Sequence, residues 1–109
     1  MARSPSRLLA VGLALALAGC ATFEGARLYD EGSAALDRGD TALAIRQLEE
    51  AAALVPDASE VQNHLGIAYL QDGREADALH AFERAVALDC SNAPAQANLR
   101  ALRARKAAR

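Results

Sequence analysis

The chain has 109 residues, a length that is enough for one domain with a modest core, and its formal net charge is −2 at pH 7. Residues 20–99 carry 14 acidic and 5 basic side chains, whereas residues 100–109 carry five basic side chains and no acid. An acidic body argues against nucleic acid as the main partner.

The N-terminal segment has the features of a removable export signal. Arg3 and Arg7 give a positive start, and residues 8–18 form an uncharged run of eleven Leu, Ala, Val and Gly residues. Such a run has the length of a signal-peptide core and is well short of the roughly 20 residues that a membrane-spanning helix needs. We therefore expect residues 1–19 to be a signal that is removed.

The end of this run, Leu17-Ala18-Gly19-Cys20, resembles the lipobox of bacterial lipoproteins. The resemblance implies that Cys20 is acylated, carries palmitate, and becomes the first residue of the mature chain, followed by a short tether at residues 20–24. Two or more acyl chains give stable anchoring. Ala21 stands where an Asp often directs retention in the inner membrane, so the resemblance favours an outer-membrane lipoprotein that faces the periplasm. The alternative is a cytoplasmic protein with an apolar N-terminal helix and a chance cysteine.

The next part of the chain predicts a pair of helices joined by a glycine turn. Leu and Ala residues recur at helical spacing over residues 41–54, with acids on the opposite face. Just before them, Gly39 can take a positive φ and so end the preceding helix. We expect helices near 24–38 and 41–54.

A second pair of helices follows, and then a single one. Ser59 followed by Gln62 predicts a capping box, Gly73 predicts a second tight turn, and Pro94 suits a helix start. We expect helices near 59–71, 75–88 and 94–106. No strand pattern of alternating Val, Ile or Thr occurs, so the sequence predicts an all-α fold.

The two helix pairs are copies of each other, because a shift of 34 residues places residues 25–58 on 59–92 with ten identities. Among these are Gly32 and Gly66, which lie inside predicted helices, where each glycine costs about 1 kcal/mol relative to Ala. We expect a close approach of the partner helix to compensate for this cost.

This repeat resembles the tetratricopeptide repeat. The second copy matches the motif at Leu65, Gly66, Tyr69, Gly73, Ala78, Phe82 and Ala85. The first copy departs from it at Glu31 and Ala35, and Cys90 replaces the closing Pro of the second. The resemblance implies an α-α superhelix of two tetratricopeptide hairpins, at residues 25–58 and 59–92, with a C-terminal capping helix at residues 93–109.

In tetratricopeptide arrays the first helix of each repeat lines a concave groove that binds a protein or peptide. The corresponding positions here are Ala26, Tyr29, Ser33, Leu36 and Asp37, and then Glu60, Asn63, Ile67, Leu70 and Gln71. This mixture suits a peptide with apolar anchors. The alternative for Leu36, Ile67 and Leu70 is that they only pack on the adjacent repeat. None of the ten positions is basic, which disfavours a clamp for a terminal carboxylate.

The remaining polar residues give no catalytic or metal-binding pattern. His64 and His80 are 16 residues apart on different predicted helices, and His80 is expected to face solvent. The sequence therefore predicts neither an enzyme nor a cofactor. With Cys20 acylated, Cys90 can form no internal disulfide; it either cross-links two copies or fills a helix end as a half-buried residue.

The combined features favour a membrane-anchored interaction module that scaffolds or helps to assemble an envelope complex, such as pilus, secretion or cell-wall machinery. Because repeat arrays usually need about three units, we expect the chain to pair with itself or with a larger partner. The alternative function is binding of the cell wall or an anionic surface through the basic tail, which consists of Arg100, Arg103, Arg105, Lys106 and Arg109. These cations equally suit the end of a capping helix.

Overall fold

The computed structural model describes residues 5–109, with side chains described for residue 17 and residues 19–109. This part of the chain forms five helices and no strand, so the predicted all-α fold is confirmed. The helices are α1 (Pro5–Asp37), α2 (Thr41–Leu54), α3 (Ser59–Gln71), α4 (Glu75–Leu88) and α5 (Ala93–Ala107).

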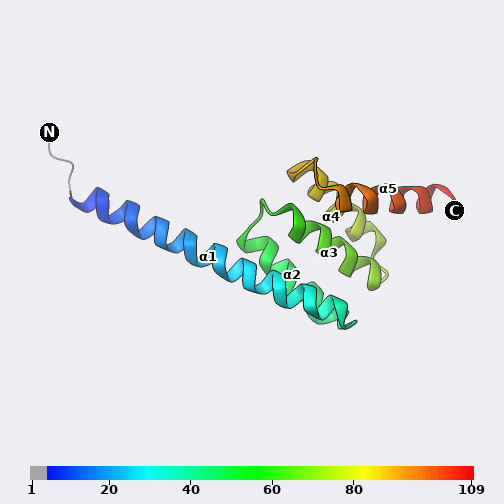
Figure 1. Ribbon diagram of the computed structural model, residues 1–109, viewed down its shortest axis with the longest axis horizontal. Coiled ribbons are helices and arrows are strands. Elements are labelled where there is room, and N and C mark those ends of the chain that lie inside the picture. Colours follow the sequence, from blue (N-terminus) through cyan, green and yellow to red (C-terminus); the bar gives the residue numbers. More distant parts are fainter. Residues whose placement is uncertain (1–4) are drawn as a thin grey trace.

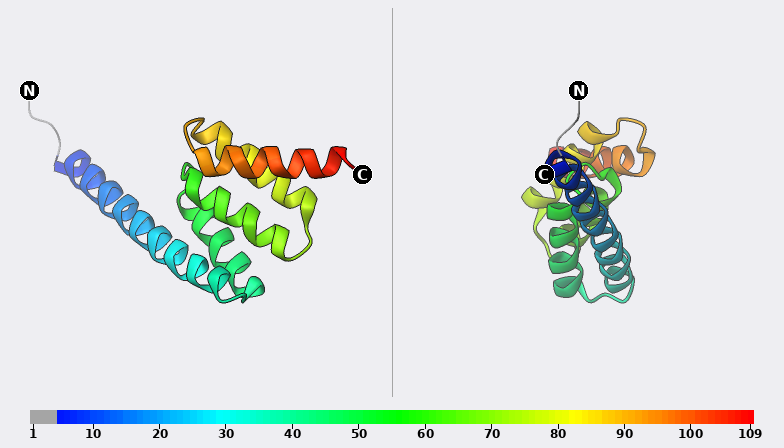
Figure 2. Two further views of the ribbon diagram at one scale, coloured as in Figure 1. Left: turned by 45° about the vertical axis from the view of Figure 1, so that its right-hand side comes forward. Right: turned by 90° about the vertical axis from the view of Figure 1, so that its left-hand side faces the viewer.

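The helices form two hairpins and a closing helix (Figure 1). The C-terminal half of α1 packs along α2, and α3 packs along α4. The hairpins stack because α2 also contacts α3, and α5 covers α4 at the end of the stack. The first half of α1 extends away from the other four helices, as the two views in Figure 2 also show.

The first helix begins earlier than the sequence analysis expected. We predicted a start near residue 24, but α1 begins at Pro5 and continues through residues 20–24. The expected start came from the proposed cleavage site, and no helix-breaking proline lies between Pro5 and Pro56. Residues 1–4, including Arg3 of the predicted signal, lie outside the described residues. Within the part of the chain that is described, no helix is long and apolar enough to cross a membrane.

The two glycine turns have the predicted geometry. Gly39 and Gly73 have φ angles of +78° and +76°, which place them in the left-handed region. After each glycine a backbone amide reaches back to the preceding helix, with Asp40 N 2.9 Å from Ala35 O and Arg74 N 2.8 Å from Tyr69 O. This pattern is the Schellman motif, and it ends α1 and α3 with little loss of hydrogen bonding.

The predicted capping box at Ser59 is wrong. The residue before the helix, Ala58, occupies the cap position, and α3 has no side-chain cap. The Ser59 hydroxyl is buried instead, where it donates to Ala85 O at 2.7 Å and accepts from Asn92 Nδ2 at 2.8 Å. Ser59 therefore forms tertiary hydrogen bonds with α4 and the start of α5 in place of the predicted local capping bond.

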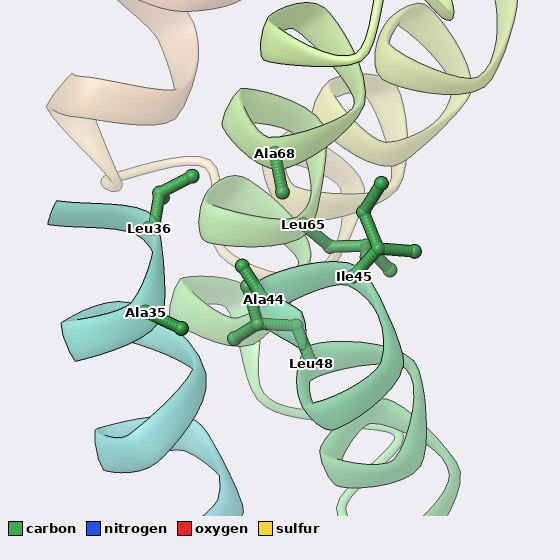
Figure 3. Packing of buried hydrophobic residues seen from close by; sticks show 7 residues of the cluster. All are labelled: Ala35, Leu36, Ala44, Ile45, Leu48, Leu65 and Ala68. Carbon is green, nitrogen blue, oxygen red and sulfur yellow. The ribbon is translucent and has the colours of Figure 1, made fainter. Parts of the chain in front are cut away.

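The core consists mainly of small and aliphatic side chains, together with the fully buried ring of Phe82. The largest cluster contains Ala35, Leu36, Ala44, Ile45, Leu48, Leu65 and Ala68 (Figure 3). Both helix-interior glycines lie against large core residues, as expected. A Cβ at Gly32 would lie 2.8 Å from Leu48 Cγ, and a Cβ at Gly66 would lie 2.5 Å from Phe82 Cε1. Each hairpin therefore packs too closely at this point to admit a methyl group without rearrangement.

Candidate peptide-binding groove

The first helices of successive repeat units, α1, α3 and α5, share one side of the stack, and two hollows lie between them. The first hollow, between α1 and the start of α3, has a volume of about 220 Å³. The second hollow, between α3 and α5, has a volume of about 180 Å³. The first is lined by Thr22, Gly25, Ala26, Tyr29, Val55, Ala58, Glu60 and Val61, and the second by Leu70, Asn98, Ala101, Leu102 and Arg105.

Four of the predicted groove positions open onto these hollows. Ala26, Tyr29 and Glu60 line the first hollow, and Leu70 lines the second. The wall of the first hollow is almost entirely apolar, with Glu60 as its one charged member. Residues from both repeats thus lie together in the first hollow, and each hollow is large enough to hold an apolar side chain.

Tyr29 joins the two repeats at the first hollow. Its ring meets the edge of the His64 ring, with 5.0 Å between centroids and an interplanar angle of 84°. The Tyr29 hydroxyl lies 3.3 Å from His64 Nδ1, which also lies 3.0 Å from Glu60 O. Burial raises the pKa of Tyr29, and the nearby charges of Glu60 and Asp30 raise it further. His64 therefore packs against Tyr29, a residue that lines the first hollow, and lies within hydrogen-bonding distance of it.

Two of the predicted groove residues are buried and hold the stack together. Leu36 is 6% exposed and belongs to the main core cluster. Asn63 is 5% exposed, and its Oδ1 accepts a hydrogen bond from Asn98 Nδ2 at 2.9 Å. Ile67 is half-buried and packs against the core on both sides. For Leu36 the structure thus supports the packing alternative, and Asn63 fixes α5 to α3.

The other predicted positions lie along the same side with differing exposure. Ser33 is half-buried, and Asp37 and Gln71 are exposed at the turn end of their helices. Gln71 Oε1 accepts a hydrogen bond from the Thr41 hydroxyl at 3.3 Å, which links α3 to the start of α2. Their roles in binding remain predictions.

Sequence reasoning missed the contribution of α5 to this side. Asn98, Ala101 and Arg105 line the second hollow, although we expected α5 to be only a cap. The signal was present, because the repeat pattern continues into residues 95–99 before it diverges. A third copy of the groove pattern would have included Ala101 and Arg105.

A second tyrosine links α3 to α2. The Tyr69 hydroxyl donates to Glu49 Oε1 at 2.8 Å, so it ties α3 to α2. The guanidinium carbon of Arg74 lies 4.5 Å from the centre of the Tyr69 ring, which is within the range of a cation–π contact. Burial and the Glu49 carboxylate raise the pKa of Tyr69 to about 12.

Much of the basic tail is engaged within the domain. Arg105 and Arg109 both contact Glu75 at the start of α4, at 2.8 and 2.7 Å. Arg103 contacts Glu83 at 3.3 Å. The Arg109 guanidinium lowers the pKa of Glu75. Because three of the five tail cations already face acids of α4, the structure favours the capping role of the tail over surface binding.

The remaining singled-out residues lie apart from the groove. His80 is exposed on α4, as predicted. Cys90 is exposed too, so the alternative in which it fills a helix end is wrong. Cys20 is exposed on α1. Over residues 5–109, no group of three or more His, Cys, Asp or Glu side chains could hold a metal ion.

A stack of helical hairpins with a shared recognition side defines the class of α-α repeat proteins. The family model described as tetratricopeptide repeat matches residues 29–97, and the chain belongs to this family. Tetratricopeptide repeats are typically non-catalytic modules for protein–protein interaction. A comparison with curated proteins finds no match for this chain.

Proposed function

We propose that this protein is a lipid-anchored tetratricopeptide module that scaffolds or helps to assemble a complex in the cell envelope, without catalysis of its own. The observation that carries the proposal is the pair of hollows between α1, α3 and α5. An apolar hollow with a few polar groups at its edge is a common form of peptide-binding site. Pilus, secretion and cell-wall machineries are the candidate settings.

The anchor in this proposal is Cys20, acylated after removal of residues 1–19. Cys20 is exposed and lies within α1. Acyl chains at this position would hold the domain at a membrane, with Cys20 two residues before Thr22, which lines the first hollow. Ala21 after the cysteine favours the periplasmic face of the outer membrane.

The anchor can be tested by mass spectrometry of the protein from cells, with Cys20→Ser as the matched variant. We expect a mature chain that begins at Cys20 and carries diacylglycerol and an N-acyl chain. Cys20→Ser should remain unprocessed and unacylated. An intact, unmodified N-terminus on the wild-type protein would contradict the proposal.

The partner surface can be tested by photo-crosslinking in living cells. Ala26 and Ala101 are exposed and line the two hollows, whereas Ala53 is exposed on α2 and lines neither of them. A photoreactive residue at Ala26 or Ala101 should capture an envelope protein, and one at Ala53 should not. Equal capture from all three positions, or none from Ala26 and Ala101, would contradict the assignment.

A further inference from the structure

The first hollow has an apolar floor and an acidic edge. Gly25 and Val61 are buried in its wall, and Val55 and Ala58 complete the apolar lining. Glu60 stands at the edge, exposed to solvent. Any side chain that fills the hollow must therefore combine apolar contact with proximity to a carboxylate.

A second carboxylate follows Tyr29 directly on α1. Asp30 is exposed one turn beyond Ala26 on α1, and its charge acts on the Tyr29 hydroxyl together with that of Glu60. Among the residues that the structure describes, neither Glu60 nor Asp30 forms an ion pair. Arg27, the cation nearest to them along α1, is held by Glu24 and Glu31 instead. The acidic edge of the first hollow thus has no cation to neutralise it within the domain.

An exposed aromatic residue extends the apolar surface. Phe23 is 74% exposed and lies seven residues before Asp30, on the same side of α1 as Ala26. Exposed aromatic residues beside a hollow are common anchors in protein interfaces, where burial of their rings supplies much of the binding energy.

From these observations we propose that the first hollow binds a basic amphipathic segment of a partner protein. One apolar side chain of that segment fills the hollow, a second packs on Phe23, and a Lys or Arg lies between Glu60 and Asp30. The inference rests on the proposed function and adds the chemistry of the partner to it. Charge complementarity selects this occupant, because an acidic segment would place like charges together.

The test measures binding of two fluorescent peptides to the full chain in a non-ionic detergent. One is a short amphipathic peptide of Leu and Lys, and the other has Glu in place of every Lys. We expect the Lys peptide to bind at least about tenfold more tightly at low salt, with the preference shrinking as salt is added.

Charge-removing variants locate the site. Glu60→Gln combined with Asp30→Asn should weaken binding of the Lys peptide by about tenfold, since each exposed pair is worth up to about fivefold. The matched control, Glu50→Gln with Asp72→Asn, removes two exposed acids that are not adjacent in the sequence to any residue lining the first hollow, and it should change binding less than about twofold.

A second variant and a second measurement separate binding from folding and from self-association. Ala26→Leu keeps both acids but fills the hollow, and it should weaken the Lys peptide while circular dichroism stays unchanged. Equal affinity for the two peptides, or an equal effect of the control pair, would overturn the proposal. So would a dimer, seen by sedimentation velocity, that the Glu60 and Asp30 changes dissociate, because the occupant would then be a second copy. If Ala101 still captures an envelope protein, only the partner chemistry fails and the proposed function stands.

Discussion

Replacement of Gly66 by Ala tests the helix packing most sharply, because two physical effects predict opposite signs. Alanine is favoured over glycine inside a helix by about 1 kcal/mol, so propensity alone predicts a more stable protein. In the structure, however, the new Cβ would lie 2.5 Å from Phe82 Cε1 and 2.6 Å from Cδ1. Contacting carbon atoms normally lie about 3.5–4.0 Å apart, so the ring or the helix must move by about 1 Å.

The Phe82 ring has no solvent-exposed surface through which it could move away. Overpacking of this kind costs about 1–3 kcal/mol, and since the 2.5 Å contact is severe we expect the upper part of that range. After the gain in propensity, Gly66→Ala should lower the free energy of unfolding by about 1–2 kcal/mol. Urea unfolding followed by circular dichroism measures this difference.

Two further variants complete the experiment. Ala34→Gly, at an exposed position inside α1, calibrates the propensity effect and should cost about 1 kcal/mol. Phe82→Leu should cost less in the Gly66→Ala background than alone, because the smaller side chain relieves the clash. A Gly66→Ala protein as stable as the wild type, or more stable, would refute the reasoning.

Three further outcomes follow from other contacts. Asn98→Ala should cost about 1–3 kcal/mol in chemical denaturation, because it leaves the buried Asn63 side chain without its donor; an unchanged midpoint would contradict this. Since the pKa of Tyr69 is raised to about 12 in the folded state, the contribution of Tyr69 to the free energy of unfolding should be fully present below pH 10 and should be lost as the pH rises toward 12. Tyr69→Phe should make the free energy of unfolding depend less on pH over this range. The same pH dependence in the variant and the wild type would contradict the prediction. Substitution of Arg100 and Lys106 by Gln should leave cell-wall retention unchanged, whereas lost retention would favour the tail as a binding surface.

The middle of the fold was predictable from sequence because local signals set its boundaries. The predicted helices at 41–54, 59–71 and 75–88 coincide with α2, α3 and α4. In each case a glycine turn or a proline-containing loop interrupts the periodicity, and these residues act locally. The start of α1 was not predictable in this way, because the proposed cleavage signal would be read by an enzyme and would not itself stop a helix.

Tertiary contacts explain what the sequence could not show about the candidate site. The repeat pattern places Asn63 on the recognition side, but only the structure shows that Asn98 covers it. The sequence also could not show that the Ser59 hydroxyl forms hydrogen bonds with Ala85 of α4 and with Asn92 before α5, instead of capping its own helix. Residues that contact α5 and residues that we propose to bind a partner occupy equivalent positions, so spacing alone does not separate them.

The central claim is that the side formed by α1, α3 and α5 binds the partner. Its most direct test is the affinity of the captured envelope protein for Ala101→Arg, compared with Ala53→Arg on α2. We expect Ala101→Arg to weaken binding by at least about tenfold, as for truncation of a central interface contact, and Ala53→Arg to leave it unchanged. Equal affinities of the two variants, or a greater loss at Ala53, would contradict the claim.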